Sequence, residues 1–162
     1  EHELLLHTET NRGSTFAVRV SITDQLQQTA PSIEIAEGAR ILLVDNDQPT
    51  REQLTFMLQE WGHDVSAFDG TQIEPIAQAA LNASVWLLDF HLDDGRTGID
   101  LYRKLIRQMP DRPTLVLTAD ISDQVRSICQ ELDLTLVRKP IRALALRSVL
   151  MRLLSASNAA RP

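Results

Sequence analysis

Residues 41–47 read Ile41-Leu42-Leu43-Val44-Asp45-Asn46-Asp47, four consecutive apolar residues followed by three polar ones. A continuous apolar run of this length is typical of a central strand in a parallel sheet, because helices cover both faces of such a strand. A second run of this kind, Val85-Trp86-Leu87-Leu88, ends on Asp89. The two stretches therefore predict buried strands that carry acidic side chains at their carboxyl ends.

Strands and helices alternate along the region that surrounds these two runs. Helices are expected at residues 49–61, 72–81, 98–109, 121–132 and 141–154, where apolar residues recur at helical spacing. Shorter strands are expected at residues 63–68, 114–117 and 134–137. The alternation predicts an α/β fold, with a doubly wound five-stranded parallel sheet and right-handed crossovers.

The amino-terminal part of the chain has a different pattern. Residues 2–10 and 14–22 are expected to be two strands around a turn at Asn11-Arg12-Gly13, followed by a mostly polar stretch with Pro31 and Gly38. We therefore expect four parts, which are a β-hairpin-like extension at residues 1–22, a linker at 23–38, the α/β domain at 39–155 and a tail at 156–162.

The composition of the chain limits its partners and its compartment. A net charge of −6 over 162 residues, without a basic stripe, argues against nucleic acid as the main partner. No apolar run approaches the roughly 20 residues of a membrane span, so direct membrane contact is not expected. Cys129 is the only cysteine, which excludes an internal disulfide and fits a cytoplasmic protein. Because the chain begins with Glu1, we expect a longer parent protein, which leaves open a membrane anchor upstream.

Polar side chains follow four of the five predicted strands at their carboxyl ends. In chain order they are Asp45, Asn46 and Asp47, then Asp89, Thr118 and Lys139. In a doubly wound sheet such positions converge on one edge, where ligands bind. The set contains carboxylates, a hydroxyl group and a cation, but no glycine-rich phosphate loop.

The charges of this set favour phosphoryl transfer with a magnesium ion. Clustered carboxylates repel one another, and Mg²⁺ prefers oxygen ligands, commonly one or two carboxylates with a phosphate oxygen. With Asp45, Asp89, Lys139 and Mg²⁺, the formal charge of the site is about +1, and an acyl phosphate on Asp89 brings it near neutrality. The site is therefore expected to accept a phosphoryl group, with the metal and Lys139 stabilising its oxygens.

Four motifs carry a likeness to a known family. They are Ile41-Leu42-Leu43-Val44-Asp45-Asn46-Asp47; Val85-Trp86-Leu87-Leu88-Asp89-Phe90-His91-Leu92 with Gly95 and Gly98; Val116-Leu117-Thr118-Ala119; and Val137-Arg138-Lys139-Pro140. With these motifs, residues 40–154 resemble the receiver domain of two-component response regulators. The resemblance covers about seven tenths of the chain. It implies a flavodoxin-like receiver fold and a phosphoryl donor that carries phosphohistidine, either a kinase or a phosphotransfer domain.

The resemblance also implies a role for each site residue. Asp89 would be the phosphoacceptor, Thr118 the switch hydroxyl and Lys139 the contact to the phosphoryl group. Asp45 and Asn46 occupy the acidic-pair positions that hold Mg²⁺, together with Asp89 and the backbone carbonyl of His91. The Lys139–Pro140 peptide would be cis.

Two positions depart from the family pattern. Asn46 stands where the second acidic residue is expected, so we predict weaker Mg²⁺ binding than a carboxylate would give, and Asp47 lies one position too far along the motif to replace it. Leu136 stands where the family often has an aromatic residue, three positions before the lysine. Coupling between an aromatic ring and Thr118 is therefore not expected.

The amino-terminal strands carry a second likeness. His2-Glu3-Leu4-Leu5-Leu6-His7 and Gly13-Ser14-Thr15-Phe16-Ala17-Val18-Arg19-Val20 resemble the last two strands of a histidine-kinase ATP-binding domain, although a generic β-hairpin is the alternative. The resemblance implies that the parent is a hybrid sensor histidine kinase with the receiver at its carboxyl end. The fragment lacks the ATP-binding motifs, so we expect a regulatory domain rather than a kinase, and a homodimer is left open.

Two other functions compete with the receiver. Haloacid-dehalogenase-like phosphatases also form an aspartyl phosphate with Mg²⁺, and Asp45-Asn46-Asp47 fits their Asp-x-Asp motif, with Asp45 as nucleophile. Residues 140–162, however, contain no Asp or Glu to complete that metal site. The second alternative is a pseudo-receiver, a binding module without phosphotransfer, which Asn46 favours and the presence of Asp89, Thr118 and Lys139 opposes.

Overall fold

The computed structural model describes residues 3–9, 13–19 and 38–159, which fall into two separate units. The first unit contains β1 (Glu3–Glu9) and β2 (Gly13–Arg19), an antiparallel pair in which Glu3 is opposite Arg19 and Glu9 is opposite Gly13. The expected hairpin-like extension is therefore present. The predicted linker lies outside the described residues, apart from Gly38 at its end.

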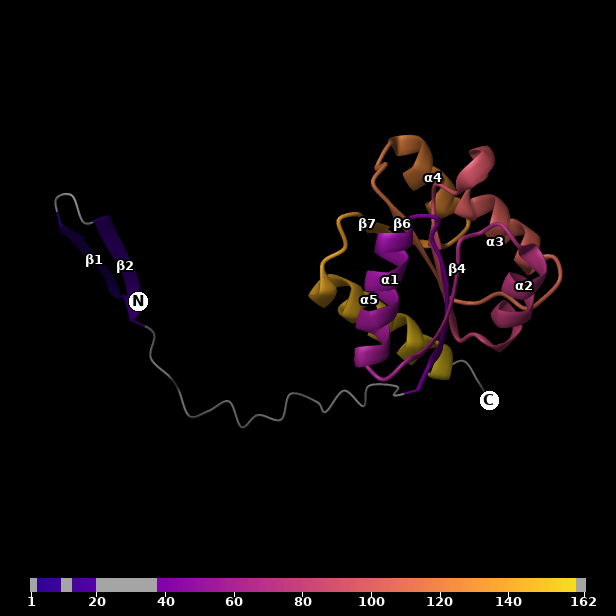
Figure 1. The fold of residues 1–162 in the computed structure, drawn as a ribbon, viewed down its shortest axis with the longest axis horizontal. Coiled ribbons are helices and arrows are strands. Elements are labelled where there is room, and N and C mark those ends of the chain that lie inside the picture. Colours follow the sequence, from indigo (N-terminus) through magenta and orange to yellow (C-terminus); the bar gives the residue numbers. More distant parts are fainter. Residues whose placement is uncertain (1–2, 10–12, 20–37, 160–162) are drawn as a thin grey trace. The chain divides into compact units, whose positions relative to one another are not determined.

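The second unit is a five-stranded parallel sheet in the order β4-β3-β5-β6-β7, with helices between the strands (Figure 1). The strands are β3 (Arg40–Val44), β4 (Asp64–Phe68), β5 (Val85–Asp89), β6 (Thr114–Thr118) and β7 (Thr135–Arg138). The helices are α1 (Gln48–Glu60), α2 (Ile73–Asn82), α3 (Gly98–Ile106), α4 (Asp123–Glu131) and α5 (Ala143–Ala159), and η1 (Asp93–Gly95) is a 3-10 turn. This arrangement confirms the predicted doubly wound, flavodoxin-like fold.

Two hydrophobic layers explain why the central strands are apolar throughout. Leu42 and Val44 of β3 pack in the layer beneath α2, α3 and α4, whereas Ile41 and Leu43 pack in the layer beneath α1 and α5. All five residues of β5 are likewise buried. Figure 1 shows α1 and α5 on one side of the sheet and α2 and α3 on the other. A strand buried on both faces has no position left for a polar side chain until it ends.

Three helices differ from their predicted lengths, and α4 runs from Asp123 to Glu131 rather than over residues 121–132. Helix α3 ends at Ile106 rather than residue 109, because Pro110 disfavours a helical conformation in the residue before it and the chain turns earlier. Helix α5 continues to Ala159 rather than residue 154, since its last residues include Ala and no Gly or Pro stops it. The helix thus takes in the first part of the segment that we expected to be a tail.

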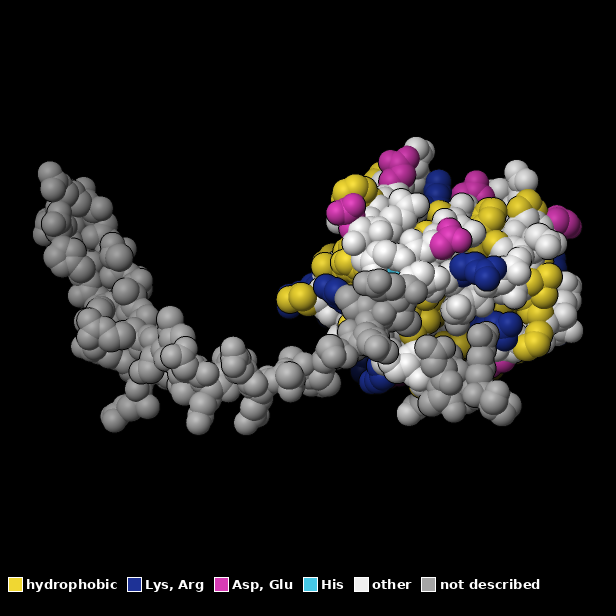
Figure 2. Space-filling model, turned by 90° about the horizontal axis from the view of Figure 1, so that it is seen from below, with side chains coloured by type: hydrophobic (Ala, Val, Ile, Leu, Met, Phe, Trp, Pro, Cys, Tyr) yellow, Lys and Arg dark blue, Asp and Glu magenta, His cyan; other side chains and the backbone are white. Residues whose placement is uncertain are grey.

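The surface of the described residues is mixed in character. On the face that Figure 2 shows, acidic, basic and hydrophobic side chains are interspersed. Among the helices that the structure describes, none is long and apolar enough to cross a membrane.

The sheet topology determines at which edge a ligand-binding crevice can form. Strand β3 pairs with β4 on one side and with β5 on the other, so the strand order reverses between β3 and β5. A crevice forms outside the carboxyl ends of the strands at such a reversal, because the connections on either side leave in opposite directions. Residues that follow β3 and β5 therefore meet there.

Candidate functional site

Three charged side chains from distant parts of the sequence meet at this edge. Asp45 directly follows β3, Asp89 is the last residue of β5, and Lys139 directly follows β7. Lys139 Nζ lies 2.8 Å from Asp45 Oδ2 and 2.9 Å from Asp89 Oδ1. The ammonium group therefore bridges the two carboxylates, in the shared crevice that the strand ends predicted.

Burial makes these charges interact strongly. The side chain of Asp45 is fully buried, that of Asp89 is 7% exposed, and that of Lys139 is 20% exposed. Burial raises the pKa of Asp89; the hydrogen bond from Lys139 opposes this shift, and the neighbouring Asp45 carboxylate adds to it. Burial alone would lower the pKa of Lys139, but its hydrogen bonds to Asp45 and Asp89 outweigh burial and raise it. The crevice thus holds a charged ammonium group beside a carboxylate that gains from further positive charge.

The backbone fixes the position of Lys139. Its N–H donates to the carbonyl oxygen of Thr118 at 2.7 Å, which ties the end of β7 to the end of β6. The Lys139–Pro140 peptide is cis, as the family resemblance implied.

The side chain of Thr118, whose carbonyl accepts this hydrogen bond, is buried. Its Oγ1 accepts a hydrogen bond from the backbone N–H of Asp120 at 3.0 Å. No hydrogen bond joins its hydroxyl to Asp89 in the part of the chain that the structure describes. In this state the hydroxyl therefore holds the loop that follows β6 rather than the acidic residue.

Asp47 has a structural role. Its Oδ2 accepts the backbone N–H of Thr50 at 2.9 Å and so caps the amino terminus of α1, where Pro49 lies in the first turn. Hydrogen bonds from Thr50 lower the pKa of Asp47. Its own N–H donates to Asp45 Oδ1 at 3.0 Å and so orients the buried carboxylate.

Asn46 has an unexpected partner. Its Nδ2 donates to Asp93 Oδ1 at 2.7 Å, across 47 positions of sequence. Neither Asp93 nor Arg51, whose Nη1 donates to the backbone carbonyl of Asp45, was predicted from the sequence to belong to the site. The one signal for Asp93 was an acidic residue four positions after Asp89, in the same loop as His91.

The loop after β5 is held by backbone hydrogen bonds. Phe90 N–H donates to the carbonyl of Leu117 at 2.8 Å, and Gly98 N–H donates to the carbonyl of Phe90 at 3.0 Å. His91 pairs with Thr97 across the loop in an isolated antiparallel bridge. The segment between Asp89 and α3 is thus fixed at both ends.

The oxygen atoms at this edge fit a hard divalent cation. Within residues 38–159, no three His, Cys, Asp or Glu side chains form a group that could hold a metal. The ligands expected from the sequence are the carboxylates of Asp45 and Asp89, which the structure brings together at Lys139, with the amide oxygen of Asn46 and the backbone carbonyl of His91. Asp89 Oδ2 accepts no hydrogen bond from the described residues, whereas Asp89 Oδ1 is paired with Lys139. Mg²⁺ takes few protein ligands of this type and keeps water or phosphate oxygens for the rest.

A comparison with models of protein families identifies the family of this domain. The model of the response regulator receiver domain matches residues 41–151, which is more than half of the chain. The chain belongs to the response regulator receiver domain family. No curated protein matches the sequence.

Solved structures of other receivers share the fold. CheY4, a chemotaxis protein of Vibrio cholerae, is 22% identical with a TM-score of 0.62, over 72% of this chain and 98% of CheY4. The BeF3-activated DrrB receiver domain is 24% identical with a TM-score of 0.62, over 73% and 98% of the two chains. A CheY-like receiver from Methanospirillum hungatei JF-1 is 19% identical with a TM-score of 0.67, over 77% and 100%. At these identities the likeness supports the fold alone.

Proposed function

We propose that this receiver domain accepts a phosphoryl group on Asp89 from a phosphohistidine in a two-component phosphorelay. The observation that carries the proposal is the contact of Lys139 Nζ with both Asp45 Oδ2 and Asp89 Oδ1, at 2.8 and 2.9 Å. An ammonium group in this place offsets one of the two carboxylate charges before transfer and faces the phosphoryl oxygens after it. Catalysis of phosphoryl transfer consists mainly of such positioning and charge stabilisation.

Each residue at the site has its own role in the phosphoryl transfer. Asp89 Oδ2, which is free of hydrogen bonds from the described residues, forms the new bond to phosphorus as the phosphorus–nitrogen bond of the donor breaks and the imidazole keeps that electron pair. Lys139 remains beside Asp89 and stabilises the phosphoryl oxygens. Asp45, held by Asp47 N–H and by Lys139, keeps its carboxylate directed into the crevice. A bound Mg²⁺ would add positive charge at the phosphoryl oxygens, with Asp45, Asp89, Asn46 and the His91 carbonyl as its protein ligands.

Thr118 is the switch in this proposal. Its hydroxyl turns to donate a hydrogen bond to the new phosphoryl group and gives up the N–H of Asp120, from which it accepts a hydrogen bond of 3.0 Å in the structure. The loop after β6 then loses a tether and shifts, and the surface near α4 changes for a partner. Leu136, which packs against the hydrophobic layer on the α4 side, provides no aromatic ring to follow this movement.

The parent protein and compartment belong to the same proposal. The antiparallel pair β1–β2 supports a remnant of a kinase ATP-binding domain, and hence a hybrid histidine kinase as the parent. A phosphohistidine-bearing kinase or phosphotransfer domain would be the donor. The single, buried and unpaired Cys129 supports a cytoplasmic setting.

Intact mass after incubation with a small phosphoryl donor and Mg²⁺ tests the proposal. Acetyl phosphate and phosphoramidate should each add one phosphoryl group, which hydroxylamine removes, as expected for an acyl phosphate. Asp89→Asn should abolish the gain, whereas Asp94→Asn, a change of the same kind on an exposed residue, should preserve it.

Other outcomes identify the alternatives. A mass gain that Asp45→Asn abolishes and Asp89→Asn preserves would point to phosphatase-like chemistry, although the capping role of Asp47 counts against that function. No gain from either small donor or from a phosphohistidine domain would favour the pseudo-receiver, for which the uncharged Asn46 is the supporting observation.

A further inference from the structure

Asn46 occupies the position where the family pattern has an acidic residue, and it is hydrogen-bonded to an acidic residue, Asp93. We infer that Asp93 acts together with Asn46 as a positioning residue for the cation: it holds the amide so that Asn46 Oδ1 faces the metal and supplies the negative charge that Asn46 lacks. The inference rests on the proposed function, because it concerns the same Mg²⁺ site. Its basis is the 2.7 Å hydrogen bond from Asn46 Nδ2 to Asp93 Oδ1.

The chemistry of the two groups determines which way the amide points. An ionised carboxylate only accepts hydrogen bonds, so the nitrogen of Asn46 must face Asp93. The amide oxygen lies on the other branch of the same planar group and therefore points away from Asp93. Asn46 Oδ1 accepts no hydrogen bond from the described residues, which leaves this oxygen available to a cation.

The charge of Asp93 is also available to the site. Its carboxylate forms no ion pair with any residue in the described part of the chain. Arg96, a basic residue of the same loop, lies 3.7 Å from Asp94 Oδ2 and donates from Nε to the backbone carbonyl of Asp93, not to its carboxylate. A carboxylate that no local cation neutralises attracts a divalent ion nearby, although the solvent around this exposed side chain screens part of its field.

The loop that carries Asp93 also carries one of the proposed metal ligands. Asp93 follows His91, whose carbonyl belongs to the oxygen set, by two positions. Leu92 N–H donates to the carbonyl of Arg96 at 3.0 Å, and Arg96 Nη1 donates to the carbonyl of Gly70 at 3.0 Å. These bonds hold the turn η1 through contacts that involve neither Asn46 nor a metal ligand.

In this arrangement two residues together supply the oxygen ligand and the negative charge that a single carboxylate would supply. A single acidic side chain provides both an oxygen ligand and a negative charge, whereas here Asn46 provides the oxygen and Asp93 the charge. Partners that orient metal ligands through hydrogen bonds affect metal affinity by about ten- to a hundredfold when they are removed. The expected loss of Mg²⁺ affinity on removal of Asp93 is accordingly about tenfold.

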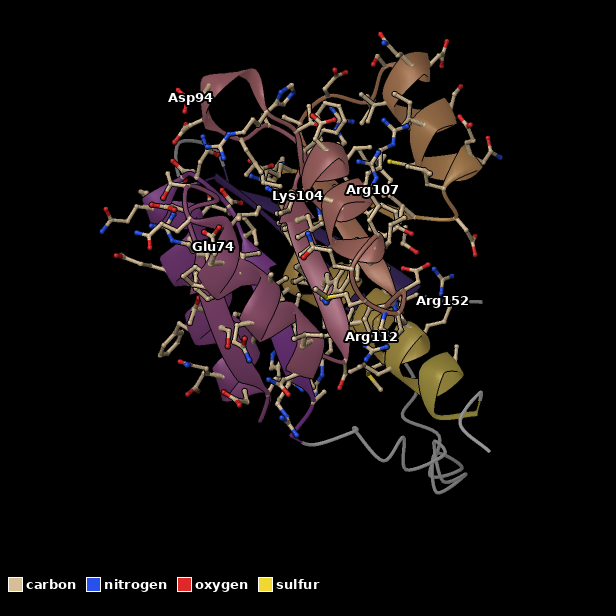
Figure 3. All side chains as sticks on the ribbon, turned by 90° about the vertical axis from the view of Figure 1, so that its right-hand side faces the viewer. Glu74, Asp94, Lys104, Arg107, Arg112 and Arg152 are labelled. Atoms are coloured by element: carbon tan, nitrogen blue, oxygen red, sulfur yellow. The ribbon has the colours of Figure 1, made fainter. Side chains whose placement is uncertain are left out.

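Titration calorimetry of the full chain with MgCl₂, without any phosphoryl donor, tests the inference. Asp93→Asn should raise the Kd for Mg²⁺ about tenfold. The matched control is Asp94→Asn, which removes the same charge from the adjacent residue. The Asp94 side chain is 87% exposed and points outward from η1 (Figure 3), so Kd should change by less than about twofold.

An exchange of the two residues separates this pairing from a merely structural role. The double variant Asn46→Asp with Asp93→Asn restores one amide and one carboxylate in reversed positions, and its Kd should return to within about threefold of the unaltered chain. A Kd for Asp93→Asn that equals that of Asp94→Asn, or a double variant no better than Asp93→Asn, would overturn the inference.

The proposed function can fail separately from this inference. If the unaltered chain binds Mg²⁺ and gains a phosphoryl group on Asp89 while Asp93→Asn binds the metal equally well, only the role of Asp93 is wrong. If the unaltered chain neither binds Mg²⁺ nor gains a phosphoryl group, the function and the inference are both wrong.

Discussion

The backbone carbonyl oxygen of Asp89 occupies the space that a side chain at Gly98 would need. A Cβ placed on Gly98 would overlap this oxygen and would also lie 3.2 Å from Leu88 Cβ. The missing side chain lets the start of α3 approach the end of β5, where Gly98 N–H reaches the carbonyl of Phe90 at 3.0 Å. Strand β5 and helix α3 are thus joined backbone to backbone.

Gly98→Ala should therefore disturb both stability and transfer. The backbone of Asp89 cannot yield as a flexible side chain would, so we expect a loss of about 1–3 kcal/mol in the free energy of unfolding by urea. The initial rate of mass gain from acetyl phosphate should also fall, because the Asp89 carboxylate moves with its backbone. Gly62→Ala is the control, since its φ of +85° makes alanine unfavourable in open space far from Asp89. It should lower stability but leave the rate unchanged, and equal rates for both variants would contradict the argument.

The sequence predicted the central strands better than the ends of the helices. Residues 41–44 and 85–88 could be assigned because burial on both faces demands a continuous apolar run. The helix ends depend on weaker local preferences, so α3 ended before Pro110 and α5 extended to Ala159, beyond the predicted limits. Such boundaries follow from the balance of small terms rather than from burial.

The site residues that follow strands could likewise be predicted, whereas a contact that depends on a loop could not. Asp45, Asp89 and Lys139 could be brought together from sequence, because parallel strands end at one edge and these residues follow strands. The partnership of Asn46 with Asp93 could not, since it depends on the path of a loop between β5 and α3. Asp47 carried a readable signal, an acidic residue just before Pro49 at the start of a helix, and the structure uses it as an amino-terminal cap.

Lys139→Met should destabilise the protein more in the absence of Mg²⁺ than in its presence. The substitution leaves Asp45 and Asp89 buried near one another without a cation, which costs roughly 3 kcal/mol or more in the free energy of unfolding. Bound Mg²⁺ should recover part of this loss by mass action. Urea unfolding with EDTA and with excess MgCl₂ measures both effects.

The only other lysine provides the control for this prediction. Lys104 is exposed on α3 (Figure 3), and Lys104→Met should change stability by less than about 0.5 kcal/mol. Adding Asp45→Asn to Lys139→Met should restore stability, because it removes one of the two repelling charges. A double variant less stable than Lys139→Met would show that charge repulsion is not the cause.

His63 should make stability depend on pH below neutrality. Its side chain is buried, Nδ1 has no hydrogen-bond partner among the described residues, and burial with the nearby Arg147 lowers its pKa from the ordinary 6.5. The folded state therefore prefers the neutral ring, while the unfolded state binds a proton near pH 6.5. The contribution of His63 is complete above that pH and is lost as the pH falls below it, with a slope of at most about 1.4 kcal/mol per pH unit. Urea unfolding between pH 7.5 and 5.5 should show this fall, and His63→Gln should flatten it; an equal fall in the variant would assign it to other groups.

Tyr102 should resist ionisation until well above pH 10. It is the only tyrosine of the chain, it is 3% exposed, and its hydroxyl donates to Asp111 Oδ2 at 3.1 Å. Burial and the Asp111 carboxylate raise its pKa to about 12 from the ordinary 10.0. Because the folded pKa is the higher one, the contribution of Tyr102 to stability is complete below pH 10 and is lost as the pH rises towards 12.

Absorbance at 295 nm follows this single phenol directly. The folded chain should show no transition near pH 10, whereas the chain in concentrated urea should titrate there. Asp111→Asn removes the neighbouring charge but leaves the ring buried, so its pKa should lie between the other two values. Coincident titration curves for the folded and the urea-unfolded chain would mean that Tyr102 is open to water, contrary to its packing against Trp86 with ring centroids 6.3 Å apart.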